Sequence, residues 1–237
     1  MSIQPFYWPV AKKFFMTKGC AYSDTPKGAM QEALKKAGIH RANIIEVSSV
    51  LDPDAEELPL TGSNTYDTKT IPHAAFALSV FAHYSGTESE TIGAGVGAAW
   101  MKSKEGERKA YVVEASGNKT VGRIKNEVML SLVDIAEAEN LTIYPKPGSK
   151  AEKPLLGRKE WERKEEGRKF RNPKAQEREY VKYLGENSND YFRIEADGIS
   201  GIPDDYGYAA AALVYVMDMD TVAAPIGEYL KEKGLLK

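Results

Sequence analysis

Three histidines are the first candidates for chemistry, because imidazole serves both as a metal ligand and as a general base. His40, His73 and His83 lie far apart in the chain and show no metal-ligand spacing. The sequence also contains neither a nucleophile elbow nor a Walker loop. We therefore predict no metal site and neither of the chemistries that those two motifs serve.

A run of glycines is the second candidate. Gly93, Gly95 and Gly97 recur at every second position of a segment of small residues. A dinucleotide-binding fingerprint requires a different glycine spacing and a helix directly after it. We interpret the run as a strand that packs closely against another layer.

Four blocks of sequence carry the remaining candidates. The first block holds a Thr-Pro helix start and ends in Ala-Gly, and the second holds an asparagine ahead of a Ser-Ser pair. The third holds a glutamate ahead of a glycine turn, and the fourth is a strand rich in alanine. In order, the blocks are TKGCAYSDTPKGAMQEALKKAG, ANIIEVSSVL, AYVVEASG and YGYAAAALVY. Their order and spacing resemble the signature of the pyruvoyl-dependent arginine decarboxylases. The resemblance covers roughly residues 12–141 and 192–217.

The resemblance implies that the chain cuts itself between Ser48 and Ser49 into chains 1–48 and 49–237. A serine hydroxyl attacks the carbonyl before it, so that the amide becomes an ester, and β-elimination followed by hydrolysis leaves a pyruvoyl group. Ser49 would become this cofactor and Ser48 the new C-terminus. The step needs a strained, firmly held backbone and a donor for the oxyanion. By resemblance, Asn43 occupies the position that assists the cleavage.

The family's activity is implied in the same way. The pyruvoyl ketone condenses with the α-amine of a small amino-acid substrate and accepts electrons when CO2 leaves. Glu114 occupies the position of the general acid, and burial can raise the pKa of such a carboxyl group towards neutrality. The expected reaction converts L-arginine to agmatine and CO2.

The substrate-binding positions implied by the resemblance are Lys27, Gln31, Leu34 and Val50. The family's helix reads Leu-Asn-Ala-Phe-Asp after Thr-Pro, and its aspartate pairs with the guanidinium group. Here the helix reads Lys-Gly-Ala-Met-Gln over residues 27–31, so a carboxylate is lost at Gln31 and a cation is gained at Lys27. The two positions share one helix face.

This departure matters for the substrate because a buried guanidinium without a carboxylate is strongly disfavoured. Glu32 is adjacent to Gln31, but one residue along a helix turns the side chain by about 100°. Glu32 can pair with the guanidinium only if the helix is rotated or a neighbouring subunit supplies the contact. An uncharged or acidic amino acid is therefore an alternative substrate.

Several elements must position these residues. The pattern predicts two helices, the first starting at Pro26 and stopping at Gly38 and the second over Lys119–Leu141. The segment Asp52–Lys69 is predicted to be a loop, and Thr70–Met101 to hold two strands that break near Ser85 and could form a hairpin. Other strands are predicted over Phe14–Cys20, Ala42–Leu51, Ala110–Ala115, Tyr191–Ala196 and Tyr208–Asp218, with a last helix over Ile226–Leu236.

The stretch 145–185 differs in composition from the rest. It holds 13 Lys and Arg residues against seven Glu residues, a local net charge of +6 in a chain whose total is −2. We interpret it as a charged insertion on the surface of one domain, residues 1–237. In a non-catalytic homologue this insertion could bind a partner or nucleic acid, although the interleaved glutamates argue against nucleic acid. The contact residues would be Arg158, Lys159, Trp161, Arg163, Lys164, Arg168, Lys169, Phe170 and Arg171.

The irregular order of strands and helices favours the α+β class. The resemblance makes this an αββα layered sandwich of the pyruvoyl-dependent decarboxylase type, assembled as a homotrimer with active sites between protomers. The single cysteine, Cys20, fits a reducing compartment. The N-terminus lacks the apolar core of a signal peptide and no run reaches the length of a membrane span, so we expect a mature, cytoplasmic protein without membrane contact.

Overall fold

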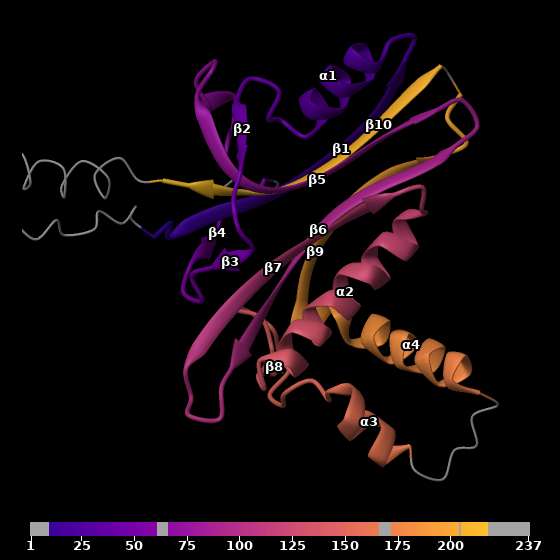
Figure 1. The fold of residues 1–237 in the computed structure, drawn as a ribbon. Helices are drawn as coiled ribbons and strands as arrows, with labels where there is room; N and C mark the ends of the chain where they lie inside the picture. Colours follow the sequence, from indigo (N-terminus) through magenta and orange to yellow (C-terminus); the bar gives the residue numbers. More distant parts are fainter. Residues whose placement is uncertain (1–9, 61–65, 166–171, 204, 218–237) are drawn as a thin grey trace, which may run out of the picture.

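Two β-sheets form the centre of the molecule. The computed structural model describes residues 10–60, 66–165, 172–203 and 205–217. The sheets lie face to face, and helices cover their outer faces (Figure 1). Most strand pairs are antiparallel. The predicted α+β class is therefore confirmed.

The first sheet is built around a strand of small residues. Ala209 to Ala212 are buried, and they contribute alternately to the layer between the sheets and to the layer under the first helix. Two of its strand pairs, β2 with β5 and β1 with β4, are parallel. Its strand order is β2 (Asn43–Glu46), β5 (Phe76–Thr87), β10 (Tyr206–Val216), β1 (Lys13–Ser23) and β4 (Glu56–Glu57).

Helix α1 (Pro26–Lys36) packs on the outer face of this sheet, against β1 and β10. Thr25 caps its N-terminus by accepting a hydrogen bond of 3.1 Å from the Gly28 N–H. The chain leaves the helix through Gly38, whose φ of +75° suits glycine. A Cβ atom at Gly19 of β1 would lie only 2.2 Å from the Ala33 carbonyl oxygen, so this glycine permits the close contact.

The second sheet carries helix α2 (Val121–Ala138) on its outer face. Cβ atoms at Gly95 and Gly97 would lie 2.6 and 2.4 Å from Ile124 and Val128 of this helix, which confirms the predicted close packing of the glycine strand. The strand order is β3 (Val50–Leu51), β7 (Arg108–Gly117), β6 (Thr91–Lys102) and β8 (Thr142–Tyr144), and β9 (Phe192–Ser200) also pairs with β6.

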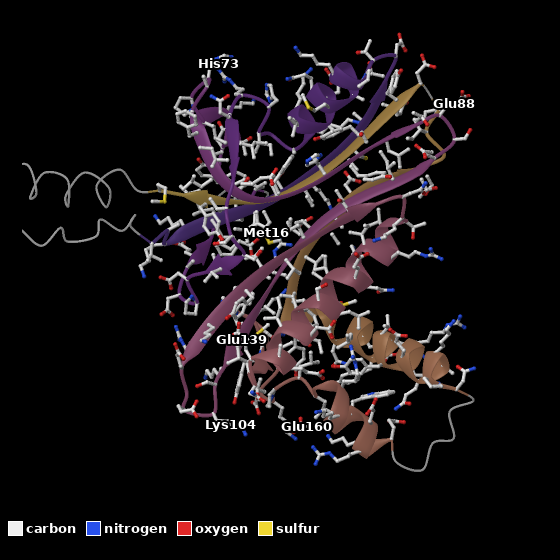
Figure 2. The ribbon with its side chains drawn as sticks, in the orientation of Figure 1. Met16, His73, Glu88, Lys104, Glu139 and Glu160 are labelled. Atoms are coloured by element: carbon white, nitrogen blue, oxygen red, sulfur yellow. The ribbon has the colours of Figure 1, made fainter. Side chains whose placement is uncertain are left out.

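Three buried clusters fill the spaces between the layers. One lies between the sheets and includes Phe14, Leu213 and Met16, which Figure 2 labels. A second lies between α1 and the first sheet, and a third lies between α2 and the second sheet. In the described part of the chain, no helix is long and apolar enough to cross a membrane.

The predicted single strand Ala42–Leu51 is wrong in one respect. Asn43–Glu46 forms β2 in the first sheet, whereas Val50–Leu51 forms β3 in the second. The chain crosses between the sheets over Val47–Ser49. Both halves carry β-branched residues that suit strands, so the local pattern does not reveal the change of sheet.

The hairpin considered for Thr70–Met101 is also wrong. The two strands exist, as β5 and β6, and are joined at residues 88–90, slightly after the predicted break. They belong to different sheets and face each other rather than pairing edge to edge. Both carry apolar residues on the face between the sheets, such as Val80 and Ile92, and this pattern fits either arrangement.

The charged stretch 145–185 is more than a surface segment. It forms α3 (Arg158–Lys164) and most of α4 (Pro173–Tyr191), which pack near α2 (Figure 1). Trp161, Tyr180 and Leu184 are at most 5% exposed and belong to the cluster under α2. Trp161 and Tyr180 supply much of this burial, so the low aliphatic content of the stretch did not indicate it.

The remaining predicted elements agree with β1, α1, β7, α2, β9 and β10, with small shifts at their ends. In its described residues, 52–60 and 66–69, the predicted loop Asp52–Lys69 holds only the two-residue β4 and the start of a short 3-10 helix, η1 (Thr68–Thr70). The last predicted helix, Ile226–Leu236, lies outside the described residues.

Candidate active site

The Ser48–Ser49 peptide bond lies in the crossover between the two sheets. Before it, the Val47 N–H donates a hydrogen bond of 3.0 Å to the Ser79 carbonyl oxygen of β5, in the first sheet. After it, the Ser49 carbonyl oxygen accepts a hydrogen bond of 2.9 Å from the Val112 N–H of β7, in the second sheet. Ser48 is exposed and Ser49 is half-buried. The bond is thus held from both sides and open to solvent.

The Ser48 carbonyl group also has a hydrogen-bond donor. The Val50 N–H donates to its oxygen at 3.0 Å, which closes a three-residue turn centred on Ser49. Neither serine has a positive φ. The position of the Ser48–Ser49 bond therefore depends on hydrogen bonds and not on a left-handed backbone.

A tyrosine of the opposite sheet contacts the same turn. The Tyr215 hydroxyl of β10 donates a hydrogen bond of 2.9 Å to the Val50 carbonyl oxygen. Burial raises the pKa of Tyr215 to about 12, so the hydroxyl keeps its proton at neutral pH and acts as a donor.

Glu114 lies two residues beyond Val112 on β7. Strand side chains alternate, so Glu114 projects to the same face as Ala110 and Val112, towards the first sheet. Its side chain is exposed, because the two-residue β3 ends before covering this part of β7. The structure thus brings Ser48, Ser49 and Glu114 to one edge of the second sheet.

Asn43 begins β2 and uses its side chain elsewhere. Its amide nitrogen donates a hydrogen bond of 3.0 Å to the Ala74 carbonyl oxygen, and its backbone N–H donates one of 2.7 Å to the Ala75 carbonyl oxygen. These bonds fix the start of β2 on the loop before β5. The donor at the Ser48 carbonyl is the Val50 N–H and not the Asn43 amide.

The predicted substrate residues of α1 lie apart from the serines. Lys27 and Gln31 are exposed on the helix that covers the outer face of the first sheet, whereas Ser49 faces the second sheet. Leu34 is 9% exposed and packs under the helix. Glu32 forms an exposed ion pair with Lys35 at 3.5 Å. One chain alone does not unite these positions with Ser49.

Three apolar side chains on strands at or beside the crossover are exposed, and we call them the apolar patch: Ile45 of β2, Val50 of β3 and Phe76 of β5. These side chains are 40%, 63% and 75% exposed. Phe76 pairs with Asn43 across β2 and β5, so Ile45 and Phe76 lie at the β2 edge of the first sheet, whereas Val50 lies at the β3 edge of the second. Large exposed apolar side chains of this kind suit contact with another molecule.

A cluster of four charged residues, which the sequence analysis missed, lies beside a cavity of about 550 Å³. Arg193 bonds Glu57 and Glu195 at 2.7 Å each, and Lys18 pairs with Glu195 at 3.0 Å. Burial would raise the pKa of Glu195, but hydrogen bonds from Arg193 and Lys18 outweigh it and hold that pKa below its usual value. The cluster joins β1, β4 and β9, which are distant in sequence, so no local motif reveals it.

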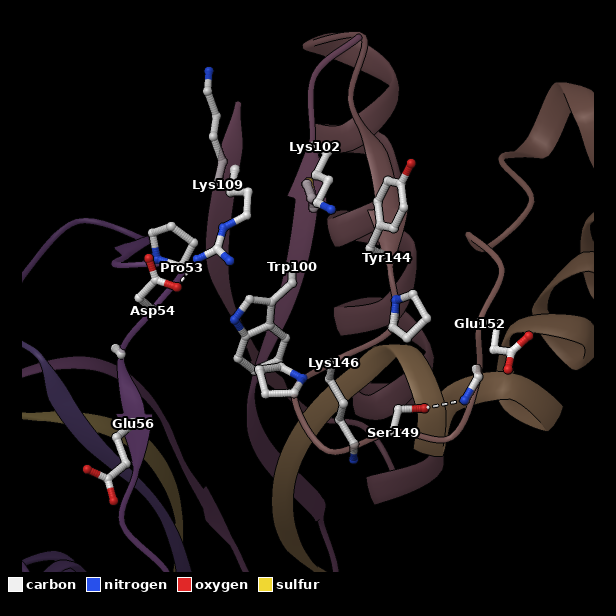
Figure 3. Close-up of a pocket in the computed structure, with 16 residues that line it drawn as sticks. Pro53, Asp54, Glu56, Trp100, Lys102, Lys109, Tyr144, Lys146, Ser149 and Glu152 are labelled. Atoms are coloured by element: carbon white, nitrogen blue, oxygen red, sulfur yellow. Dashed lines mark hydrogen bonds and ion pairs between the residues drawn. The ribbon is translucent and has the colours of Figure 1, made fainter. Parts of the chain in front are cut away.

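A cavity of about 670 Å³ lies at the other end of β7 (Figure 3). Trp100 and Tyr144 line it, and the Lys102 ammonium lies 4.6 Å from the centre of the Tyr144 ring. Lys109, also in its wall, is five residues from Glu114, or about 17 Å along an extended strand. This cavity is thus separate from the serines. The described residues include no group of side chains that could hold a metal ion.

Comparison with known proteins identifies the family. A family model described as pyruvoyl-dependent arginine decarboxylase matches residues 13–220. Among proteins named pyruvoyl-dependent arginine decarboxylase, that of Methanocaldococcus jannaschii is 29% identical over 99 residues, which are 41% of this chain and 55% of that protein. That of Pyrococcus abyssi is 28% identical over 156 residues, 60% of this chain and 92% of that protein. The chain therefore belongs to the pyruvoyl-dependent arginine decarboxylase family.

Proposed function

We propose that this chain cuts itself between Ser48 and Ser49 and then decarboxylates an amino acid with a pyruvoyl group derived from Ser49. The observation that carries the proposal is the family match over residues 13–220, which includes both serines and Glu114. The arrangement fits: the carbonyl to be attacked has an N–H donor, and a carboxylate lies on the adjacent strand.

The cleavage uses only atoms of this chain and one water molecule. The Ser49 Oγ bonds to the Ser48 carbonyl carbon, the C–N bond breaks, and the hydroxyl proton passes to the nitrogen, which leaves an ester. Loss of the Ser49 α-proton then breaks the Cβ–Oγ bond, so Ser48 ends in a carboxylate and residue 49 becomes dehydroalanine. Its imine tautomer takes up water and releases ammonia. The products are chains 1–48 and 49–237.

Glu114 acts after CO2 has left the substrate. The pyruvoyl group supplies a carbonyl that accepts electrons. Glu114 delivers a proton to the substrate α-carbon, and its place beyond Val112, which bonds Ser49, supports this role. Asn43 assists the cleavage indirectly, because its hydrogen bonds fix the start of β2 ahead of the serines.

We further infer that the whole chain is a single domain with the αββα sandwich of the pyruvoyl-dependent decarboxylases. The clusters on either side of the two facing sheets support this layered order. The charged segment is then an extension of the layer formed by α2. Trp161 is 5% exposed, so it does not belong to the partner-binding surface of the alternative, non-catalytic hypothesis. Arg168, Lys169, Phe170 and Arg171 of that surface lie outside the described residues.

The protein works as a trimer with shared sites. Val50, next to the serines, and Ile45 and Phe76, on β2 and β5, are exposed, and Gln31 lies on the outer face of the first sheet. A neighbouring protomer that covers the patch with its own α1 would bring Lys27 and Gln31 to Ser49. The pocket is then formed by two chains.

L-Arginine is the proposed substrate, giving agmatine and CO2. The names of the related proteins support it. Gln31 and Lys27 oppose it, because they leave the guanidinium without the carboxylate that the family helix supplies. A neutral or acidic amino acid remains the second candidate because of this local charge change.

Ser49→Ala tests the cleavage. The variant has no hydroxyl at the attacking position, so it should remain one uncut chain without activity. Ser48→Ala is the matched control and should be cut, since the Ser48 hydroxyl takes no part. Denaturing gels and intact mass measure both. Normal decarboxylation by Ser49→Ala would show that the cofactor arises elsewhere.

Glu114→Gln tests the general acid. Cleavage and substrate binding should persist, while kcat should fall by a factor of about 10²–10⁴. Glu107→Gln, another exposed glutamate near the start of β7, should keep its kcat. Steady-state CO2 release measures both variants. An unchanged kcat in Glu114→Gln would remove this residue from the mechanism.

The trimer can be tested by light scattering under native conditions. The mass should correspond to three protomers, and Phe76→Asp should lower the assembled fraction because it places a charge in the apolar patch. Val10→Asp alters a side chain of similar exposure, 59%, outside the patch and should assemble normally. A wild-type monomer would contradict the shared site.

Gln31→Asp tests the substrate across a panel of amino acids. Restoring the carboxylate should strengthen arginine binding about tenfold to a hundredfold, the effect of a hydrogen bond to a charged group. Glu32→Gln shows whether the adjacent carboxylate already compensates. Arginine as the best wild-type substrate, with no gain in Gln31→Asp, would refute this assignment of the pocket. If the wild type prefers a neutral or acidic amino acid, that amino acid and not arginine is the substrate.

A further inference from the structure

The residues after the Ser48–Ser49 bond are held by three hydrogen bonds. The Val50 N–H donates to the Ser48 carbonyl oxygen at 3.0 Å, the Val112 N–H donates to the Ser49 carbonyl oxygen at 2.9 Å, and the Tyr215 hydroxyl donates to the Val50 carbonyl oxygen at 2.9 Å. Two donors are backbone groups. Tyr215 is the only side-chain donor among these three bonds, and it comes from the opposite sheet.

The Val50 N–H is placed where charge develops during cleavage. When the Ser49 Oγ bonds to the Ser48 carbonyl carbon, the Ser48 oxygen becomes an oxyanion. A donor already at 3.0 Å from that oxygen stabilises the charge, because hydrogen bonds to charged oxygens are shorter and stronger than those to neutral ones.

The direction of this N–H depends on two neighbouring peptide planes. The Ser49 carbonyl and the Val50 N–H share one planar unit, so the bond from Val112 orients the donor. Tyr215 fixes the next unit through the Val50 carbonyl. The segment needs this support, because β3 has only two residues, lies at the edge of its sheet, and leaves the Val50 side chain 63% exposed.

We propose that Tyr215 is a positioning residue for the self-cleavage and acts by holding Val50 so that its N–H points at the Ser48 carbonyl oxygen. The inference rests on the proposed cleavage between Ser48 and Ser49. It also gives a role to the last residue of the YGYAAAALVY block. The tyrosine ring packs against the cluster between the sheets, and its hydroxyl reaches across to β3.

Tyr215→Phe removes this hydroxyl and leaves the ring. The first-order rate of cleavage of freshly synthesised precursor, followed by intact mass, should fall about 3- to 10-fold, as expected for one neutral hydrogen bond. Tyr191→Phe is the matched control, because the Tyr191 hydroxyl donates a similar bond of 2.8 Å to the Lys153 carbonyl oxygen, far along the chain from the serines. Its cleavage rate should stay within about twofold of the wild type.

A second variant distinguishes a positioning role of Tyr215 from a general loss of stability. Replacing Val50 by its α-hydroxy acid analogue exchanges the N–H for an ester oxygen, and cleavage should slow about 10²- to 10³-fold, as for loss of one oxyanion donor. If Tyr215 acts through that N–H, adding Tyr215→Phe to this chain should cause no further slowing.

The outcomes distinguish this inference from the proposed function. A wild-type chain that is never cut, or a Ser49→Ala chain that is still cut, would refute the cleavage itself. If the wild type is cut and Ser49→Ala is not, the cleavage stands. Three results would then overturn the role of Tyr215 alone. They are a wild-type cleavage rate in Tyr215→Phe, an equal slowing of cleavage in Tyr191→Phe, and a further slowing when Tyr215→Phe is added to the ester variant.

Discussion

The crossover between the two sheets is the constraint on which the candidate site depends. Facing sheets lie about 10 Å apart, and the four Cα steps from Glu46 to Val50 span at most about 14 Å when extended. Val47–Ser49 joins β2 to β3 across this gap, and the turn centred on Ser49 takes up part of its length. Hydrogen bonds to Ser79 on one side and from Val112 on the other hold both ends. A peptide bond in this position has few conformations available, which is what an intramolecular attack by a neighbouring hydroxyl requires.

The small residues of the core set the distances that this crossover bridges. Ala209 and Ala211 of β10 face the second sheet, and Gly95 and Gly97 of β6 let α2 approach its outer face. Larger side chains would push the layers apart and stretch the link at residues 47–49. The ion pairs of Arg193 tie β9 to β4 and so connect the sheets at a further point. The alanine and glycine strands thus serve the site although none of their side chains takes part in chemistry.

The sequence predicted the elements whose signals are local. Thr25 and Pro26 mark the start of α1, and the spacing of apolar residues marks α2, so both helices were found. Which sheet a strand joins depends on residues distant in sequence. The pattern of β-branched residues therefore does not reveal the change of sheet after Glu46. For the site, the serine pair and Glu114 were predicted from a family resemblance. The hydrogen-bond donors at Val50 and Tyr215 could be found only in the structure, because a backbone N–H has no sequence signature and Tyr215 is 165 residues from its acceptor.

The open edge of β7 has a consequence for how substrate preference can change. Glu114 and the serines lie on an uncovered edge, whereas Gln31 and Lys27 lie on a helix that supports only the first sheet. In the proposed trimer, the reacting groups and the side-chain recognition residues of one pocket come from different protomers. The exposed residues of α1 can then change charge without disturbing the crossover, since neither side chain packs in the core. A chain of this family can therefore keep the serines and Glu114 while losing the carboxylate at position 31.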